Sequence, residues 1–471
     1  MAQPPQEQIH ETWLNSNRAV PSRFIRPVLE FTRVEAAGGI VLLIAAVVAL
    51  LWANSPWYES YFRLFNAHIE ISGAVIHIDE SFKHLINDGL MAIFFFVVGL
   101  EIKRELVVGE LNSVKKAALP AMAALGGMVV PAAVFIAFVI TAEPTAIDGW
   151  GIPMATDIAF SVGVVALLGS RVSVGAKLFL LALAIVDDIG AILVIALFYT
   201  DDLDFVWLAV AAALIAAIYI LRRARVWGFP IYFLLGAGVW YAFLESGVHA
   251  TIAGVILGLM TPVTSFYTDE QFRQKAQQVL DRWDVNRASP HAEERLDQDA
   301  TELAKVANAS VSPLDRLEHA LHPWSSFVIV PLFALANAGV RFVGQETSIA
   351  EELVSPVTLG ITFGLLLGKP IGVTLATFIG VKLNLGVLPA RTTLRTIVGL
   401  GFLAGIGFTV SLFITELAYR ESVFADEAKL GIFIASAVAG VIGFLILRGA
   451  RTPSEEFTEA ADQLADTTEA S

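Results

Sequence analysis

Residues 181–197 read LALAIVDDIGAILVIAL, an apolar run that is interrupted once, by the adjacent carboxylates Asp187 and Asp188. A run of this kind predicts a helix that crosses a bilayer, which takes roughly 20 mostly apolar residues. Each ionisable residue at membrane depth costs at least about 2.5–3.5 kcal/mol on insertion scales, so such residues mark functional sites by default. The run therefore predicts a membrane helix that carries an ion site.

The whole chain has the composition of a membrane protein. Of its 471 residues, 56% are hydrophobic and only 16% are charged, whereas a soluble domain has about 25% charged residues. The first 30 residues are polar and lack the pattern of a cleavable signal peptide. The absence of cysteine excludes a disulfide framework, thiolate catalysis and cysteine-based metal sites. The net charge of −14 comes largely from the soluble segments, and we expect no nucleic-acid partner.

Twelve stretches are predicted to span the membrane. Their expected cores are residues 34–52, 85–100, 117–141, 152–169, 174–199, 205–221, 229–244, 248–261, 324–339, 356–378, 396–416 and 428–447. The seventh and eighth are short and nearly touch, so this pair is the one most easily miscounted. The fold class expected is an all-α polytopic membrane protein.

The basic residues indicate which loops face the cytoplasm, because cytoplasmic loops are rich in Lys and Arg. With the amino terminus placed inside, the inside segments hold 25 Lys and Arg residues and the outside segments hold 5. The remaining one, Lys369, lies within a span. This asymmetry predicts an even number of spans, with both termini in the cytoplasm.

Four segments are expected to lie outside the bilayer. Residues 66–80 alternate apolar and polar around Ser72 and Gly73, which predicts a β-hairpin on the outside. It is either an ordered loop or an edge that pairs with another subunit. Residues 264–312 form a charged cytoplasmic insertion that we expect to contain surface helix. The membrane domain, 34–449, is flanked by a cytoplasmic arm, 1–33, and by an acidic tail, 450–471, that we expect to be disordered.

The adjacent carboxylates predict competition between a proton and a cation. Neighbours on a helix point about 100° apart, so both can face one wide or wet cavity. Both cannot easily stay ionised at low dielectric, since desolvation and like charge favour the protonated form. A hard monovalent cation needs oxygen ligands and favours the ionised form, so proton and cation compete for the same oxygens. The alternative is a polar pair that only bonds to neighbouring helices.

The fourth and eleventh predicted spans each contain a break. In the fourth, Pro153 removes a backbone donor just before Thr156 and Asp157; in the eleventh, Gly405 and Gly407 lie in mid-membrane. Interrupted helices at matching positions of two halves point to a transporter's binding site, and the two repeats would be residues 117–199 and 356–447. Close helix packing is the alternative for the glycines.

Other charged residues within the predicted spans supply candidates for charge compensation. An acid stabilises the positive end of a half-helix and a base the negative end, roles for which Asp157 and Lys369 are the candidates. Lys369 must find an acid or lose its charge, and its possible partners are Asp157, Asp187 and Asp188. The alternative is a structural lysine whose charge reaches the interface. The remaining intramembrane acid is Asp88, and the residues nearer the span ends are Glu35, Glu101, Glu105, His249 and Glu416.

Seven collinear motifs resemble the bacterial NhaA-type sodium/proton antiporters. They are INDGLMAIFFFVVGLEIKREL (86–106), IPMATDIAFSVGVVALLGSR (152–171), ALAIVDDIGAILVIALFYT (182–200), SGVHATIAGVILG (246–258), RLEHALHPWSSFVIVPLFALANAGV (316–340), LLLGKPIG (365–372) and GIGFTVSLFI (405–414). The resemblance runs from about residue 34 to 449. It implies an inverted-repeat fold whose discontinuous helices four and eleven cross.

The resemblance also implies a function. It implies a transporter of the inner membrane, not an enzyme, that exchanges sodium or lithium for protons electrogenically, under control by alkaline pH and without a cofactor. Asp187 and Asp188 would bind the cation and carry protons. Thr156 and Asp157 would belong to the helix crossing, with Lys369 as the charged partner of Asp187. The hairpin 66–80 resembles the dimer contact of the family, which implies a homodimer in the lipid bilayer.

A cytoplasmic pH-sensing group is a further implication of the resemblance. It maps onto Glu101, Arg104, Glu105, Glu318, His319 and His322, with His249 placed beside them. His319 and His322 lie three apart, on one helical face, and histidine changes charge near pH 6.5 unless its pKa is shifted. One departure is Asp315, which stands where the family can carry a lysine. The reversed charge puts the pH of activation in doubt.

Three other classes of function compete with this interpretation. A sodium-coupled solute symporter would need a polar and aromatic pocket near the breaks, where the sequence has mainly Gly, Ala and Phe. A membrane enzyme is disfavoured because Asp187 and Asp188 have no third acid in register for a prenyl transferase, and only Asp157 with Asp187 suggests an aspartyl protease. In a passive channel, a buried titratable pair with a lysine would impede conduction.

Overall fold

The protein is built almost entirely from helices. The computed structural model describes residues 37–72, 77–200, 203–224, 226, 229–287, 292–342, 349–389, 392–420 and 422–450, so the predictions for the arm 1–33 and for all of the tail beyond 450 lie outside the described residues. The first half contains α2 (Ala37–Ala53), α3 (Tyr58–Phe65), β1 (His68–Ser72), β2 (His77–Ser81), α4 (Phe82–Leu85), η3 (Ile86–Leu90), α5 (Met91–Val107), α6 (Val114–Val139), η4 (Pro144–Met154), α7 (Ile158–Leu168), η5 (Gly169–Arg171), α8 (Val174–Phe198), α9 (Phe205–Arg223), α10 (Phe229–Glu245) and α11 (Thr251–Met260).

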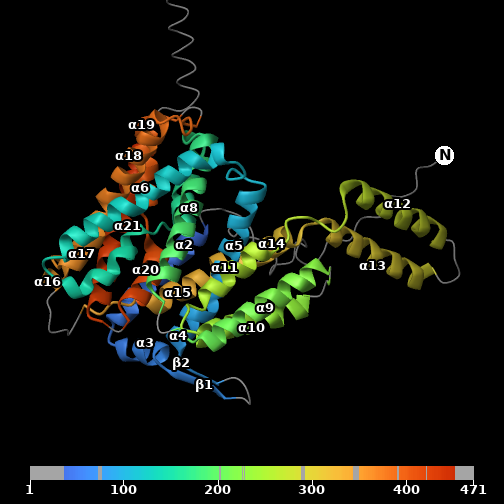
Figure 1. Cartoon of the computed structure of the whole chain (residues 1–471), viewed down its shortest axis with the longest axis horizontal. Helices are drawn as coiled ribbons and strands as arrows, with labels where there is room; N and C mark the ends of the chain where they lie inside the picture. Colours follow the sequence, from blue (N-terminus) through green and yellow to red (C-terminus); the bar gives the residue numbers. More distant parts are fainter. Residues whose placement is uncertain are drawn as a thin grey trace, which may run out of the picture.

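The second half continues the bundle. It contains α12 (Asp269–Asn286), α13 (Ala292–Ser310), α14 (Pro313–Trp324), η6 (Ser325–Ile329), α15 (Val330–Asn337), α16 (Ile349–Leu353), α17 (Pro356–Phe363), η7 (Gly364–Gly368), α18 (Lys369–Lys382), α19 (Leu394–Ala404), α20 (Phe408–Ala418) and α21 (Phe424–Arg448). Figure 1 shows the late helices α17 to α21 beside the early helices α6 and α8, so that distant parts of the chain form one bundle.

The lengths of the apolar helices make this a multi-pass membrane protein. Within the described residues, seven helical segments are long and apolar enough to cross a bilayer, and ten spans result if each of three bent helix pairs is counted as one. Two shorter apolar helices, Pro230–Glu245 and Thr251–Met260, coincide with the short seventh and eighth predicted spans. The count of twelve remains a prediction.

Some helices extend further than their apolar cores predict. The second predicted span, 85–100, is part of a continuous helical segment, Phe82–Val107, and the ninth, 324–339, is part of Pro313–Asn337. The ninth begins early because the Ser312 side chain accepts a hydrogen bond from the backbone N–H of Asp315 at 3.0 Å and caps α14. These added turns are polar, so apolar periodicity does not detect them.

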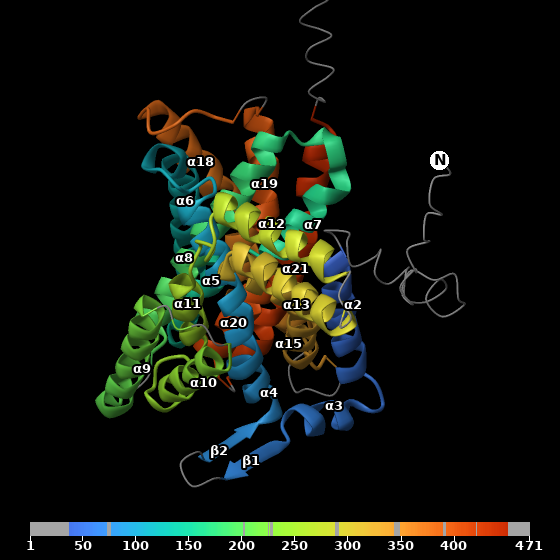
Figure 2. The ribbon, with the colours of Figure 1, turned by 90° about the vertical axis from the view of Figure 1, so that its right-hand side faces the viewer.

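Two small antiparallel units project from the helix bundle. Strands β1 and β2 pair with Ile69 opposite Glu80, at the bottom of Figure 2. The turn between them, residues 73–76, lies outside the described residues. The helices α12 and α13 of the insertion pack on each other, where Asn286 donates to Asp299 at 2.7 Å, and they extend away from the bundle in Figure 1.

Close contact between α6 and α18 positions the site. A side chain at Gly126 would collide with the backbone of Gly372, and the reverse also holds. Glycine at both positions therefore lets the two backbones approach without side chains between them. This contact brings the first turn of α18, which begins at Lys369, against the middle of the bundle.

Candidate functional site

The carboxylate pair is buried in the middle of α8. The side chain of Ser173 caps this helix at its start by accepting from the N–H of Ala176 at 3.2 Å. Asp187 is 1% exposed and Asp188 is 4% exposed. One oxygen of each, Oδ1, is buried without a hydrogen-bond partner among the described residues. Buried carboxylate oxygens are rarely left unpaired, so these two oxygens, on adjacent residues, are available to a ligand.

The other oxygen of Asp187 has two partners. The ammonium of Lys369, which is fully buried, lies 2.5 Å from Asp187 Oδ2. The hydroxyl of Thr156 lies 2.6 Å from the same oxygen and 2.8 Å from the carbonyl of Ala404. A hydroxyl has one proton to donate, so Thr156 donates to Asp187 or to Ala404, but not to both at once. Asp187 is thus held in place on one side and open on the other.

Two breaks in the helices meet beside this pair. The axes of η4 and α7 bend by 43° and those of α19 and α20 by 45°. The backbone N–H of Asp157 donates to the carbonyl of Ile406 at 2.6 Å, which joins the two breaks directly. The breaks predicted in the fourth and eleventh spans are therefore present and in contact.

Asp157 stabilises two helix starts at once. Its Oδ1 accepts from the N–H of Phe160 at 2.9 Å and caps α7. Its Oδ2 accepts from the N–H and the hydroxyl of Thr409, in the first turn of α20, at 3.1 and 2.7 Å. Because a helix start carries a partial positive charge, one carboxylate compensates the positive ends of both half-helices.

Lys369 lies at the opposite kind of helix end. Besides Asp187, its ammonium donates to the carbonyl of Met154, the last residue of η4. A helix C-terminus carries a partial negative charge, so the lysine compensates this end while it pairs with the carboxylate. The five-residue π-turn η7 immediately precedes Lys369, and such turns occur often at functional sites.

Carbonyl groups freed by each break are satisfied by hydroxyls of the other half. Ser161, on α7, donates to the carbonyl of Leu403 at 2.7 Å, and Ser411, on α20, donates to that of Ile152 at 2.8 Å. Broken helices inside a membrane need such partners, because unsatisfied backbone groups cost several kcal/mol there. The pairing is reciprocal, because each broken span donates a hydroxyl to a carbonyl of the other.

The carboxylate oxygens that remain unpaired in the described part of the site are of the type that a small, hard cation prefers. Among the residues that the structure describes, no group of three or more His, Cys, Asp and Glu side chains could hold a metal ion. The open oxygens of Asp187 and Asp188 can provide two anionic ligands, and further ligands would be carbonyls or water. The two carboxylates can bind a cation when they are ionised, and they hold protons when they are neutral.

Two of the residues predicted to sense pH are brought together where α5 packs against α14. Arg104, on α5, pairs with Glu318, on α14, at 2.7 Å. Glu105 accepts from the N–H of Glu110 at 2.8 Å, and Glu101 is half-buried on the same face of α5. His319 and His322 are exposed on α14.

Asp315, the residue that departs from the family pattern, bonds within its own turn. The hydroxyl of Ser312 donates to Asp315 Oδ2 at 2.7 Å. The carboxylate therefore completes the cap of α14 and lies one turn ahead of His319. Its charge belongs to the start of this helix, where a negative charge is favourable.

Two other predicted residues lie apart from that cluster. His249 is buried, and its Nε2 lies 2.5 Å from the carbonyl of Tyr199, at the end of α8. Ile102, beside Glu101, belongs to the same apolar cluster as Ala182, about 25 Å along α8 from Tyr199 at 1.5 Å per residue. Asp88 lies in η3, 3.5 Å from His84. The structure does not bring His249 or Asp88 to the sensor residues.

Several residues of the site were not predicted from the sequence. They are Ser161, Tyr199, Thr409, Ser411 and Tyr419, all of which hydrogen-bond to a break or to η4. An ion triad was also missed: Glu416 contacts Lys83 at 2.6 Å and Lys429 at 2.9 Å and links α4, α20 and α21. Hydroxyls within an apolar span give no periodic signal. Gly149 and Gly151 did give a signal, because they lie where Tyr419 and Tyr199 approach η4.

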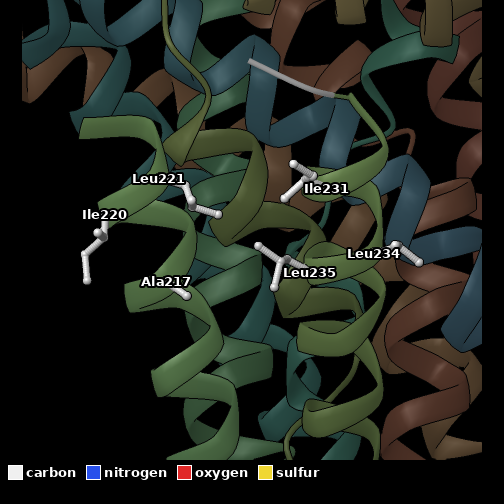
Figure 3. Close-up of a pocket in the computed structure, with 6 residues that line it drawn as sticks. All are labelled: Ala217, Ile220, Leu221, Ile231, Leu234 and Leu235. Atoms are coloured by element: carbon white, nitrogen blue, oxygen red, sulfur yellow. The ribbon is translucent and has the colours of Figure 1, made fainter. Parts of the chain in front are cut away.

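An open groove between α9 and α10 has the wrong chemistry for an ion (Figure 3). It has a volume of about 510 Å³. Its lining residues are Ala217, Ile220, Leu221, Ile231, Leu234 and Leu235. All six are apolar, so this groove offers no ligand to a cation or a proton.

Comparison with known proteins shows which protein family this chain resembles. The family described as "Na+/H+ antiporter 1" matches residues 29–447. The chain is 46% identical over 425 residues to "Na(+)/H(+) antiporter NhaA 2" of Syntrophotalea carbinolica, with 90% of this chain and 96% of the relative covered. It is 42% identical over 460 residues to "Na(+)/H(+) antiporter NhaA 2" of Sorangium cellulosum (97% of each chain) and 43% identical over 433 residues to "Na(+)/H(+) antiporter NhaA" of Koribacter versatilis (92% and 93%).

Proposed function

The chain belongs to the Na+/H+ antiporter 1 family, and on that premise we propose that it exchanges Na+, or Li+, for H+ across the bacterial inner membrane. The observation that carries this proposal is the buried pair Asp187 and Asp188, each with an oxygen that has no partner in the described part of the chain. A cation that enters the pair takes these oxygens as ligands. A proton that enters instead neutralises the same groups, so the two cargoes exclude each other.

Lys369 makes the exchange responsive to the cation. In the absence of a cation its ammonium neutralises Asp187 at 2.5 Å. A cation bound by both carboxylates competes for Asp187 and repels the ammonium, which favours release of a proton from the lysine. Asp188 releases its own proton when it becomes a ligand. If both protons leave for each cation, the exchange moves net charge and is electrogenic.

The scaffold that we propose has twelve spans in two inverted repeats, with helices four and eleven crossed at their breaks. Both termini are cytoplasmic in this arrangement, as the distribution of Lys and Arg indicates. Asp157 and Lys369 compensate the ends of the half-helices, and Thr156 links the crossing to Asp187. Charge compensation lets the breaks persist at membrane depth without a permanent ion.

Control by alkaline pH is proposed for the cytoplasmic ends of α5 and α14. The residues are Glu101, Arg104, Glu105, Glu318, His319 and His322. The pair formed by Arg104 and Glu318 ties the two helices together, so we propose that a change of charge in this group alters how the two helices are held. Asp315 adds a negative charge one turn away, so we propose that its charge adjusts the pH of activation.

The experiment that tests the proposed function measures proton movement in inverted vesicles. A respiration-driven pH gradient is monitored with a quenched fluorescent dye, and Na+, Li+ or K+ is added across pH 6.5–9. We expect Na+ and Li+ to restore fluorescence and K+ to have no effect. Absence of a response to both Na+ and Li+, with the protein present in the membrane, would contradict the function.

The Lys369→Ala variant is expected to weaken exchange and to change its pH profile and apparent Na+ affinity. The substitution removes the counter-ion of Asp187 and the donor to Met154, and breaking such a buried pair destabilises a protein by about 3–5 kcal/mol. Dye dequenching and thermal unfolding in detergent measure both effects. Lys382→Ala, at the exposed end of the same helix, is the control. An unchanged profile and affinity for Lys369→Ala would reduce the lysine to a structural role.

Homodimer formation through the hairpin 66–80 is a further part of the proposal. An isolated two-stranded sheet is marginally stable in water, and its open edges are available to pair with those of a second copy. Deletion of residues 68–78 is expected to shift the protein toward the monomer in native mass measurements. A dimer of unaltered abundance would exclude this contact.

A further inference from the structure

The ion triad formed by Lys83, Glu416 and Lys429 lies apart from the candidate ion site. The two carboxylate oxygens of Glu416, near the end of α20, lie 2.6 Å from the ammonium of Lys83 and 2.9 Å from that of Lys429. Lys83 belongs to α4, which follows directly on the hairpin (Figure 2), and Lys429 belongs to α21. Charges within membrane-spanning segments are costly, so a second charged group outside the site is expected to have a function.

The triad lies at one end of an interface between α20 and the continuous helical segment of α4, η3 and α5. Phe413 precedes Glu416 by three residues, on the same face of α20, and its ring centroid lies 5.2 Å from that of Phe95 on α5. Arg420, just beyond α20, acts electrostatically on Asp88 in η3. The interface thus has an aromatic contact in its interior and charged contacts at the end near the hairpin.

Helix α20 connects this interface to the candidate ion site. In its first turn, the N–H and the hydroxyl of Thr409 donate to Asp157, and the hydroxyl of Ser411 donates to the carbonyl of Ile152. The helix has only 11 residues from this turn to its end. A movement of the first turn at the break therefore moves Glu416 as well, so the triad and the site are mechanically coupled.

The triad is arranged so that one of its two ion pairs can break. The side chain of Lys83 is 26% exposed and that of Lys429 only 6%. Breaking a buried ion pair is strongly destabilising when it leaves a charge without compensation. If Lys83 separates from Glu416, however, its ammonium can reach water and Glu416 still has Lys429. Lys83 is therefore the partner that can be released.

We propose that Lys83 and Glu416 form an outer latch, which holds α20 against the segment of α4, η3 and α5 and closes the ion site toward the hairpin. The latch breaks when the site opens to that side, which is the extracellular side in the proposed topology. The inference rests on the proposed function, because a transporter that carries two ions through one fixed site must expose that site to one side at a time. Phe413 and Phe95 form the apolar contact beneath the latch.

The test measures how often the interface opens to the outside. The chain has no cysteine, so a single reporter can be introduced as Met91→Cys. Met91 is fully buried at the start of α5, one turn before Phe95 and on the same face. Right-side-out vesicles are treated with a membrane-impermeant thiol reagent in the absence of Na+. We expect Lys83→Met to raise the labelling rate about 5-fold, the lower end of typical couplings between sites.

Three variants in the same background serve as controls. Lys83→Arg keeps the charge and should leave the labelling rate unchanged. Arg63→Met should also leave it unchanged, because this side chain is 82% exposed and pairs with Glu59 within α3. Lys429→Met is the sharpest comparison, since it removes the more buried lysine but leaves the latch, and labelling should not accelerate. A general loosening of the fold would instead accelerate labelling most in Lys429→Met.

The outcomes separate the latch from the function itself. No acceleration in Lys83→Met, or equal acceleration in Lys83→Met and Lys429→Met, would overturn the latch. If Lys429→Met does not fold, Lys83→Met and Lys83→Arg decide, and equal labelling rates for these two would overturn it. Labelling is measured without Na+ and does not depend on exchange. Absence of Na+-driven exchange by the wild type would overturn the proposed function and, with it, the transport role of the latch.

Discussion

The Asp188→Asn variant is expected to reduce Na+-driven proton movement by at least ~100-fold, since even outer-shell partners of a bound metal ion are worth about 10–100-fold. The substitution replaces a buried carboxylate with a neutral amide of the same shape. It removes both a cation ligand and a proton carrier, while the open oxygen Oδ1 shows that no protein hydrogen bond is lost there. Dye dequenching in inverted vesicles measures the effect.

Asp187→Asn is expected to abolish exchange as well, but with an additional loss of stability. Lys369 would keep its charge at a fully buried position without a carboxylate 2.5 Å away, and removing one partner of a buried pair costs about 3–5 kcal/mol. Asp284→Asn, on the exposed surface of α12, is the control for both. If Asp187→Asn and Asp188→Asn both retain wild-type dequenching, the ion site lies elsewhere.

The Asp157→Ala variant is also expected to have a large effect, in this case through the scaffold. It removes the cap of α7 and both hydrogen bonds from Thr409 at the start of α20. A lost cap costs about 1 kcal/mol, and hydrogen bonds to a charged group are worth about 1.5–3 kcal/mol each, so we expect a destabilisation on the order of 4–7 kcal/mol. Exchange should be lost because the two breaks separate.

Asp204→Ala is the matched control for that experiment. Asp204 caps α9 by accepting from the N–H groups of Val206 and Trp207 at 2.8 and 3.3 Å, but it serves only one helix. Thermal unfolding in detergent should therefore show a cost of about 1 kcal/mol for Asp204→Ala and several times that for Asp157→Ala. Equal costs would show that the double cap contributes nothing to holding the breaks together.

Long membrane helices could be predicted from the sequence because a bilayer leaves the backbone few options. Every N–H and C=O within it must be paired internally, so long apolar runs such as 174–199 became helices with nearly the expected ends. The start of the ninth span was missed because Ser312 and Pro313 begin a polar amphipathic turn. Such turns are governed by capping, which the apolar pattern does not report.

The site could be predicted in part. Charged residues at membrane depth are so costly that Asp157, Asp187 and Lys369 could be identified as candidate site residues without the family resemblance. The structure brings all three to the place where the two breaks meet. Which carbonyl each hydroxyl reaches depends on the angle at which the half-helices meet. Tyr199 and Tyr419 were therefore not singled out, although the glycines that face them are visible in GWG at 149–151.

The account depends most on the claim that a proton and a sodium ion compete for Asp187 and Asp188. The measurement that tests it most directly is proton release from detergent-purified protein in weakly buffered solution when NaCl is added, with KCl as the control. The account predicts that Na+ releases protons from the wild-type protein and that the double variant Asp187→Asn, Asp188→Asn releases none. Sodium binding to the wild type without proton release, or equal release from the double variant, would contradict it.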